Sequence, residues 1–331
     1  MRTVMALKSE TVGASKAVRV VLYGLGPIGV ATGKLALSKE SIQVVAAVDI
    51  DPAKVGRDLG EVLGIGKKLG VTVVDKLSVA LKKTKADVVL HTTSSYIPVF
   101  FPQLVEIASA GLNVVSSSEE LFYPHLRGSR ESKKLDALAK QKGVVILGTG
   151  VNPGFVMDTL PVVLTAVCQR VDSVKVTRIV DASTRRMPLQ RKIGVGITAD
   201  EFKAKAKTGK FGHVGLCESL VFVASALGWQ LDTVEETIEP VLAPRAFKTE
   251  FFKVKKGHVA GLRQVARGIA SDRVLLTYEL QMAAGSTDPH DRIEISGVPN
   301  LDVRVNGGTP GDLATPAMLI NAIPRVLTAK P

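Results

Sequence analysis

The sequence predicts an α/β protein: a doubly wound parallel sheet joined to a second α+β domain built on an open, mainly antiparallel sheet. Up to about residue 150, short apolar β-branched runs alternate with helical stretches, as they do in βαβ units. A G-x-G-x-x-G run directly follows the first apolar run. Beyond residue 150 apolar side chains recur at every second position, which is typical of strands with one covered face.

Composition sets the outer limits of this prediction. The 331 residues are 46% hydrophobic, which is enough for about two domains with sizeable cores. The net charge of +12 comes from scattered basic pairs without interleaved aromatic residues, so we expect a solvated basic surface and no nucleic-acid partner. No apolar run is long enough for a membrane span.

Cysteine usage and the N-terminal residues bear on the compartment. Cys168 and Cys217 lie in apolar surroundings and no metal-ligand spacing occurs, so we expect reduced thiols, no metal site and a cytoplasmic protein. Residues 1–17 read as a disordered lead. Their basic character leaves organelle targeting open.

The glycine-rich run after the first strand is typical of a dinucleotide site. The strand Val18–Tyr23 ends directly at the first glycine, and proline stands where a helix would begin. Free N–H groups at that helix start would bind a diphosphate. We therefore expect a Rossmann domain over residues 18–150, with cofactor contacts at Gly24, Leu25, Gly26, Pro27, Ile28 and Gly29.

The second apolar run ends in an acid, about 20 residues after the last glycine. Asp49 can accept both ribose hydroxyls, which favours NAD, and Ile50 beside it joins the expected site. Arg57 and the nearby Lys54 could pair with a 2′-phosphate, so NADP stays open.

Further strands of the parallel sheet are expected at residues 71–74, 87–93, 113–118 and 144–150. Thr92 and Thr93 end one of them, at the edge where such sheets bind ligands, so they could contact the cofactor ribose. Their alternative role is structural, as β-formers or helix caps.

A domain boundary is expected after Gly150. A turn at residues 152–154 leads into a connecting helix, and residues 151–305 form a substrate and dimerisation domain. Its strands are expected at 174–180, 249–254, 274–281, 292–296 and 301–305, with an apolar helix at 213–229 on one face. Residues 306–331 are expected to form a helix that returns to the Rossmann domain.

Several longer segments together resemble a known family. The motifs GLGPIG, NVVSSSEELFYP, GVNPGFVMDTLP, VDASTRRMPLQRKIGVG, GHVGLCES and PGDLATPAMLINAIPRV are similar to those of 2,4-diaminopentanoate dehydrogenases and the related native amine dehydrogenases. These enzymes have a dihydrodipicolinate reductase-like architecture. The resemblance implies NAD(P)-dependent oxidative deamination of an amine, reversible as reductive amination of a ketone or aldehyde with ammonia. It also implies a homodimer.

Two adjacent glutamates follow the fifth strand of the parallel sheet. Hydride transfer from an amine needs a group that manages the amine's protons, and a carboxylate can do so. Glu119 and Glu120 lie at the expected place, although either could be a solvated loop acid. The family has a catalytic glutamate in this motif, and we expect it at Glu120, with Glu119 as the alternate.

Other candidates have a functional and a structural interpretation. Asn152 could bind the nicotinamide carboxamide or simply form a turn before proline. Phe155 and Met157 could form an apolar wall of the substrate pocket or pack in the core. Arg178 and His213 resemble pocket positions of the family, but could belong to an ion pair and to the core.

Other classes of protein share parts of this sequence pattern. A dihydrodipicolinate reductase-like imine or ketone reductase would have the same architecture, but that reductase's histidine pair and substrate motif are missing from residues 176–192. Neither cysteine stands where a semialdehyde dehydrogenase needs its nucleophile. A non-enzymatic NAD(P)-binding sensor would keep the glycine loop without needing the carboxylate.

Overall fold

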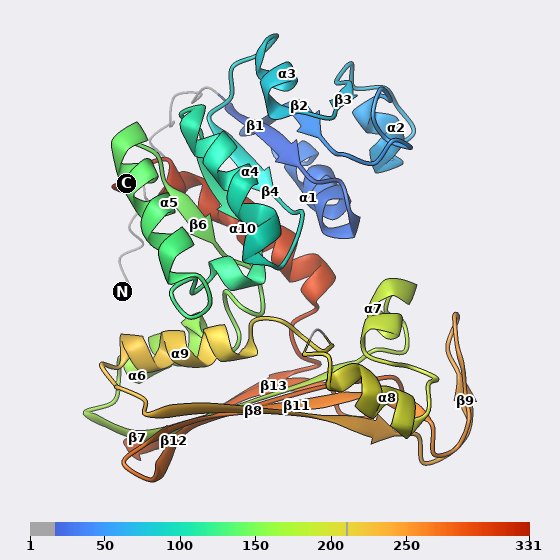
Figure 1. The fold of residues 1–331 in the computed structure, drawn as a ribbon, viewed down its shortest axis with the longest axis vertical. Helices are drawn as coiled ribbons and strands as arrows, with labels where there is room; N and C mark the ends of the chain where they lie inside the picture. Colours follow the sequence, from blue (N-terminus) through green and yellow to red (C-terminus); the bar gives the residue numbers. More distant parts are fainter. Residues whose placement is uncertain (1–16, 210) are drawn as a thin grey trace, which may run out of the picture.

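The computed structural model describes residues 17–209 and 211–331. A parallel sheet covered by helices forms one body, and a second sheet, with helices on the side facing the first body, forms the other (Figure 1). The predicted disordered lead lies outside the described residues except for Ala17.

The first body is a six-stranded parallel sheet of order β3-β2-β1-β4-β5-β6. The order reverses direction at β1, which confirms the doubly wound Rossmann topology. Its strands are β1 (Val18–Tyr23), β2 (Ile42–Val48), β3 (Val73–Val74), β4 (Val88–His91), β5 (Asn113–Ser116) and β6 (Ile146–Gly148). Its helices are α1 (Pro27–Leu37), α2 (Leu59–Leu63), α3 (Leu77–Leu81), α4 (Ile97–Ser109) and α5 (Ser129–Lys142), with the short 3-10 helix η1 (Glu119–Leu121) after β5.

Both faces of this sheet are buried. Val20 and Leu22 of β1 pack in the cluster that also contains α1 residues, whereas Val21 and Tyr23 pack in the cluster on the α4 side. Burial on two faces explains why β1 is continuously apolar and does not alternate.

The glycine loop brings β1, α1 and β4 close together. Gly24 has φ +93°, and a Cβ there would lie 2.8 Å from the Thr92 carbonyl oxygen. A Cβ at Gly29 would lie 1.9 Å from the carbonyl oxygen of Gly24. Only glycine fits these two positions, so α1 can begin directly against the strand ends.

The second body is built on a six-stranded sheet of order β14-β13-β7-β12-β11-β8. Only β7 and β12 pair in parallel; every other neighbouring pair is antiparallel, which confirms the open, mainly antiparallel sheet. Its strands are β7 (Arg170–Asp181), β8 (Thr233–Leu242), β11 (Val259–Ala270), β12 (Arg273–Ala283), β13 (His290–Val298) and β14 (Leu301–Asn306). Its helices are α6 (Thr159–Thr165), α7 (Met187–Lys192), α8 (Ala199–Ala206) and α9 (Leu216–Ala226).

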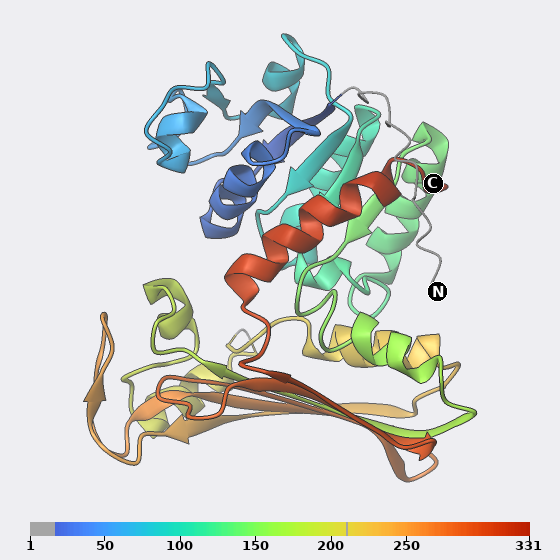
Figure 2. The same cartoon turned by 180° about the vertical axis from the view of Figure 1, so that it is seen from behind.

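The helices of this body lie on the side of the sheet that faces the Rossmann body (Figures 1 and 2). Leu276, Tyr278 and Leu280 of β12 are completely buried on that side, while Thr277 and Glu279 between them are partly exposed on the other. The alternation read from the sequence therefore reports a sheet with one covered face.

Two details of the second sheet differ from the sequence prediction. The run 249–254 is not a strand of this sheet: Thr249 accepts the N–H groups of Phe251 and Phe252 in a turn, and only short pieces pair, as β9 (Phe247–Lys248) and β10 (Lys253–Val254). The strands β8 and β11 were not predicted. Acidic residues and proline in β8 and glycines in β11 obscure their alternation.

The C-terminal helix α10 (Gly311–Val326) leaves the second body and crosses the back of the parallel sheet beside α1 (Figure 2). Leu319, Ile320 and Ile323 fill the same buried cluster as β1. Among the described residues, no helix is both long and apolar enough to cross a membrane.

Candidate active site

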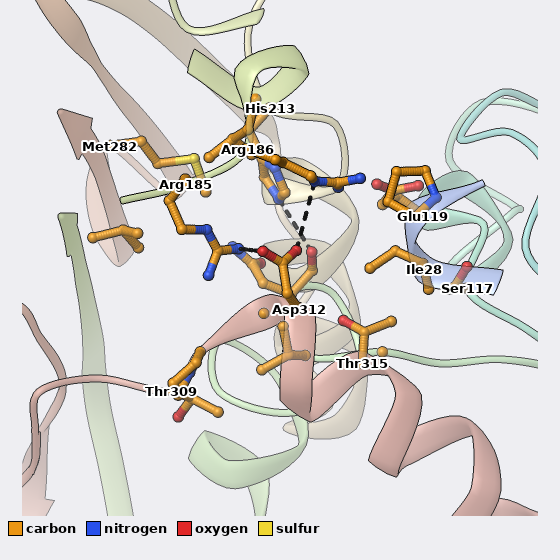
Figure 3. A pocket seen from close by; sticks show the side chains of 18 of the residues that line it. Ile28, Ser117, Glu119, Arg185, Arg186, His213, Met282, Thr309, Asp312 and Thr315 are labelled. Atoms are coloured by element: carbon orange, nitrogen blue, oxygen red, sulfur yellow. Dashed lines mark hydrogen bonds and ion pairs between the residues drawn. The ribbon is translucent and has the colours of Figure 1, made fainter. Parts of the chain in front are cut away.

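A cavity of about 570 Å³ lies between the two bodies. Its Rossmann wall consists of the glycine loop and the segments that follow β4, β5 and β6. Its opposite wall consists of β7, the loop from β7 to α7, α7 itself and the start of α10 (Figure 3). This is the carboxyl edge of the parallel sheet, where doubly wound folds bind their ligands.

The glycine loop forms one end of the cavity. Gly26, Pro27 and Ile28 line it, and a Cβ at Gly26 would meet no protein atom within 4 Å. The N-terminus of α1 has no side-chain cap, so its first N–H groups remain available to an anion. Backbone and space here fit a diphosphate.

Thr92 and Thr93 both line the cavity. The Thr92 hydroxyl donates to the Gly24 carbonyl at 2.8 Å, so it also supports the glycine loop. The Thr93 hydroxyl donates to the Gln103 side chain at 2.6 Å and lies 3.0 Å from His91 Nε2. The structural and functional interpretations of these threonines are thus compatible.

Asp49 directly follows β2 and lies against the glycine loop. Its carboxylate accepts the N–H of Leu25 at 2.6 Å and that of Asp51 at 2.8 Å, and Lys54 Nζ lies 3.3 Å away. Ile50 beside it is 81% exposed.

Arg57 lies on the surface beyond Asp49. Its guanidinium reaches the Ala53 carbonyl at 3.4 Å and Glu61 at 3.8 Å, and about half of the side chain is exposed. Its few long contacts leave it free to turn toward a phosphate.

The two adjacent glutamates point to different places. Glu120 is buried, and its Oε2 accepts the N–H of Ile97 at 2.7 Å, the first residue of α4. Glu119 instead lines the cavity. Burial raises the pKa of Glu119, against the opposing effects of Lys192 and a hydrogen bond from Ser95. Of the pair, Glu119 is the one that belongs to the cavity wall.

Asn152 presents a free amide to the same cavity. It is 8% exposed, yet neither its Nδ2 nor its Oδ1 has a hydrogen-bond partner among the described residues. An unsatisfied buried amide is costly, so a donor and acceptor from a ligand are expected there. A nicotinamide carboxamide offers both.

His213 contacts the backbone of Asn152. Its Nε2 lies 3.1 Å from the Asn152 carbonyl oxygen, which fits an imidazole that donates through Nε2. Burial lowers the pKa of His213 to about 3, so the ring is neutral at ordinary pH. His213 lines the cavity as an uncharged group.

Arg178 also lines the cavity, but its guanidinium is already engaged. Nη1 donates to Asp291 and Nη2 to the Thr309 carbonyl, both at 2.6 Å. Burial lowers the pKa of Arg178. This ion pair holds β7, β13 and the chain entering α10 together.

Phe155 and Met157 lie elsewhere. Met157 is completely buried and Phe155 packs against the same cluster, the core of the second body. Neither is among the residues of the cavity wall.

Several charged residues of the cavity were missed by sequence reasoning. Arg185 and Arg186 share one partner, Asp312 at the start of α10, with N–O distances of 3.1 and 3.7 Å. Lys192 of α7 also lines the wall. Figure 3 shows the two arginines around Asp312, and Glu119 beside Ile28 on the opposite wall. Arg185 and Arg186 stand in the sequence motif RRMPLQRK. Nothing in that motif shows that they face α10.

A glycine loop at the switch point of a parallel sheet, an unsatisfied buried amide and a carboxyl group on the cavity wall together fit an oxidoreductase that uses a nicotinamide dinucleotide. No cluster of potential metal ligands occurs in residues 17–209 and 211–331. Residues 155–331 match the family model for the 2,4-diaminopentanoate dehydrogenase C-terminal domain, and residues 18–148 match that for the dihydrodipicolinate reductase N-terminus. The chain belongs to the 2,4-diaminopentanoate dehydrogenase family, and it is an NAD(P)-dependent amine dehydrogenase.

Similar proteins cover nearly the whole chain. A 2,4-diaminopentanoate dehydrogenase from Acetoanaerobium sticklandii is 30% identical, over 95% of this chain and 91% of that protein. The solved structure of an amine dehydrogenase from Mycobacterium smegmatis has a TM-score of 0.82 at 28% identity, covering 95% of this chain and 93% of the other. A dihydrodipicolinate reductase from Paenisporosarcina sp. TG-14 shares the fold, with a TM-score of 0.55 at 14% identity over 95% of this chain and 96% of that one.

Proposed function

We propose that this enzyme interconverts an amine and the corresponding ketone or aldehyde plus ammonia, with Glu119 as the group that moves the protons. One observation carries the assignment. Of two adjacent glutamates at the carboxyl edge of the parallel sheet, Glu119 lines the cavity, whereas Glu120 is hydrogen-bonded to the start of α4.

The chemistry asks for a carboxyl group that can both take up and release a proton. An ammonium substrate must lose a proton before its C–H bond can give up a hydride, and Glu119 as carboxylate accepts that proton. In the reverse direction ammonia adds to the carbonyl carbon and water must leave, and Glu119 as acid protonates the departing hydroxyl. Burial raises the pKa of Glu119 and so makes its carboxylate a stronger base, which suits a group that must take up a proton.

The bound dinucleotide would accept the hydride during deamination and supply it during amination. The glycine loop and the N-terminus of α1 would hold its diphosphate. Asn152 would bind its carboxamide, and Asp49 has lone pairs left to accept a ribose hydroxyl. Lys54 and Arg57 could instead take up a 2′-phosphate, so the same pocket suits NADP.

Three basic side chains line the substrate end of the cavity, together with the acidic residues Asp181 and Asp312. Arg185 and Arg186 share the single carboxylate of Asp312, and Lys192 stands on the same wall. The Nε atoms of both arginines are buried without a hydrogen-bond partner among the described residues. These groups favour an amine that also carries an anionic group, such as a carboxylate, over a purely hydrocarbon amine.

We also propose a homodimer that forms through the uncovered face of the second sheet. That face carries cross-strand ion pairs such as Arg263–Glu279 and Arg292–Asp302, and a two-fold pairing of one face with itself is the commonest assembly. Light scattering should give twice the chain mass.

A cytoplasmic location is consistent with two cysteines that form no disulfide.

The proposed function is tested by following NAD(P)H consumption with a panel of ketones and aldehydes, each with and without ammonium. Half of the panel should carry a carboxylate and half should be uncharged analogues of equal length. We expect oxidation of NAD(P)H that depends on ammonium and is fastest with an anionic carbonyl compound. Consumption that does not depend on ammonium would indicate a carbonyl reductase instead.

A further inference from the structure

The first turn of α9 contacts both segments that carry the proposed site groups. Ser219 donates its hydroxyl to Asp158 at 2.8 Å, and the same carboxylate oxygen accepts the N–H of Gly154, next to the Asn152 turn. Gly215, at the start of α9, has φ +108°, and a Cβ there would lie 2.4 Å from Pro153 and 3.3 Å from the Cβ of Glu119. The second body thus lies against Glu119 and the turn at residues 152–154 at one place.

Glu218 lies in the same turn and is completely buried. Its Oε1 accepts a short hydrogen bond from the Nε of Arg127, which belongs to the Rossmann body. Its Oε2 has no hydrogen-bond partner among the described residues. A buried carboxylate is costly, and truncating its cationic partner would leave it uncompensated, so this ion pair strongly constrains how the two bodies meet.

The segment between Glu119 and Arg127 packs against the N-terminal part of α9. Phe122 packs on Phe222 of α9 with ring centroids 4.8 Å apart, and Tyr123 meets the same ring at 6.5 Å. The segment is therefore fixed to α9 at Glu119, at its aromatic middle and at Arg127. Figure 1 shows α9 lying between the second sheet and the Rossmann helices.

We propose that Glu218 is a positioning residue for the amine dehydrogenase reaction. Through its ion pair with Arg127, it holds residues 119–127 against the second body. This inference rests on the proposed role of Glu119. An ion pair with one buried partner adds little net stability compared with well-packed apolar residues, but it fixes geometry, and geometry is what a proton-transferring carboxyl group needs.

The test compares Glu218→Gln with the parental enzyme. Gln keeps the shape and can still accept a hydrogen bond, but the charge is lost. We expect kcat to fall about tenfold or more through misplacement of Glu119 while the Kd for NAD(P)H stays within about twofold. In the deamination direction, where Glu119 acts as a carboxylate, the acid limb of the pH–rate profile should move to lower pH, because water that enters around a loosened Glu119 removes part of the burial that raises its pKa.

Substitutions of the half-exposed partner keep the test valid even if Glu218→Gln does not fold. Arg127→Lys keeps the cation and should retain much of kcat, whereas Arg127→Gln should behave like Glu218→Gln. The matched control is Arg19→Met, which breaks the partly buried Arg19–Asp87 ion pair within the Rossmann body and should leave kcat and the profile unchanged.

Amide hydrogen exchange supplies a readout that does not depend on activity. Residues 119–127 should exchange faster in Glu218→Gln than in the parental enzyme, and not in Arg19→Met. Unchanged exchange, or a lower melting temperature with parental kcat and pH profile, would overturn the positioning role. Failure of Glu119→Gln to lower turnover would instead overturn the proposed function, and the exchange result would still report on the contact itself.

Discussion

The two ends of the cavity offer different parts of the chain to a ligand. At the cofactor end, the glycine loop and the start of α1 offer backbone N–H groups and open space. At the substrate end, the wall consists of charged side chains such as Arg185, Arg186 and Asp312. Backbone recognition depends on a local spacing of glycines, whereas side-chain recognition depends on which distant segments the fold brings together.

We therefore expect the two ends to tolerate different substitutions. The cofactor end should respond to any side chain that fills its space, whatever the chemistry of that side chain. The substrate end should respond to charge and should do so only for ligands that carry the opposite charge.

The largest effect is expected for Gly26→Val. Gly26 has φ −66°, so valine is not strained by its backbone, and the new side chain enters the cavity without meeting protein atoms. The variant should fold normally and lose measurable NAD(P)H binding in a fluorescence titration. Gly26→Ala, with less bulk, should lose part of it. A folded Gly26→Val protein with parental affinity would show that the cofactor does not bind at this loop.

A smaller effect, limited to charged substrates, is expected for the double variant Arg185→Met/Arg186→Met. For an anionic carbonyl substrate, kcat/KM should fall about 30-fold or more, because buried charge partners are removed. For an uncharged analogue of the same length it should change little. Equal losses for both substrates would mean that the arginines act through Asp312 on the structure and not on the substrate.

Acid should lower the stability of the fold through the buried His91, which lies next to the cavity residue Thr93. His91 lies completely buried beneath Thr93, where Ser116 and Gln103 hydrogen-bond its ring, and burial lowers its pKa to about 4. The unfolded chain's histidine takes up a proton below about pH 6.5, whereas the folded one does so only near its lowered pKa. Stability is therefore complete above pH 6.5 and is lost as the pH falls.

Between pH 6.5 and 5 this histidine should cost about 2 kcal/mol of unfolding free energy. Urea titrations at several pH values measure the loss, to which the buried His213 adds its own share. The His91→Gln variant should show a shallower decline over the same range. An identical slope in the variant would exclude His91 as a source of acid sensitivity.

The smallest effect is expected at Asp49. Asp49→Ser removes a hydroxyl acceptor and a negative charge together, so the Kd for NADH should rise roughly tenfold while that for NADPH falls. Because the carboxylate also accepts the N–H of Leu25, part of the loss will be shared by both cofactors. If the two constants change by the same factor, Asp49 only supports the loop.

The sequence predicted most of the Rossmann body because its signals are local. Val18–Tyr23, the glycines and Asp49 lie within one βαβ unit. Their spacing is enough to place the glycine loop and Asp49 at the carboxyl edge of the sheet. The second sheet was predicted in outline, but β8 and β11 were missed because acidic residues, proline and glycine obscure the alternation that defines a strand.

The site was harder to predict where two segments must meet. The motif singled out two adjacent glutamates, but which of them faces the cavity depends on the backbone N–H of Ile97, which lies on another element and binds Glu120. Arg185 and Asp312 are far apart in sequence and meet only because α10 returns from the second sheet. Phe155 and Met157 follow the Asn152 turn closely, yet the chain turns them into the core.

The central claim, that Glu119 moves the protons of the amine reaction, is tested most directly by comparing the turnover of Glu119→Gln and Glu120→Gln with a good carbonyl substrate and ammonium. Glu119→Gln should keep its affinity for NAD(P)H and lose about 10²–10⁴ in kcat, the usual contribution of a positioned acid–base group. Glu120→Gln should keep most of its turnover, because that side chain can still accept the N–H of Ile97. Near-parental turnover in Glu119→Gln, or the larger loss in Glu120→Gln, would contradict the account.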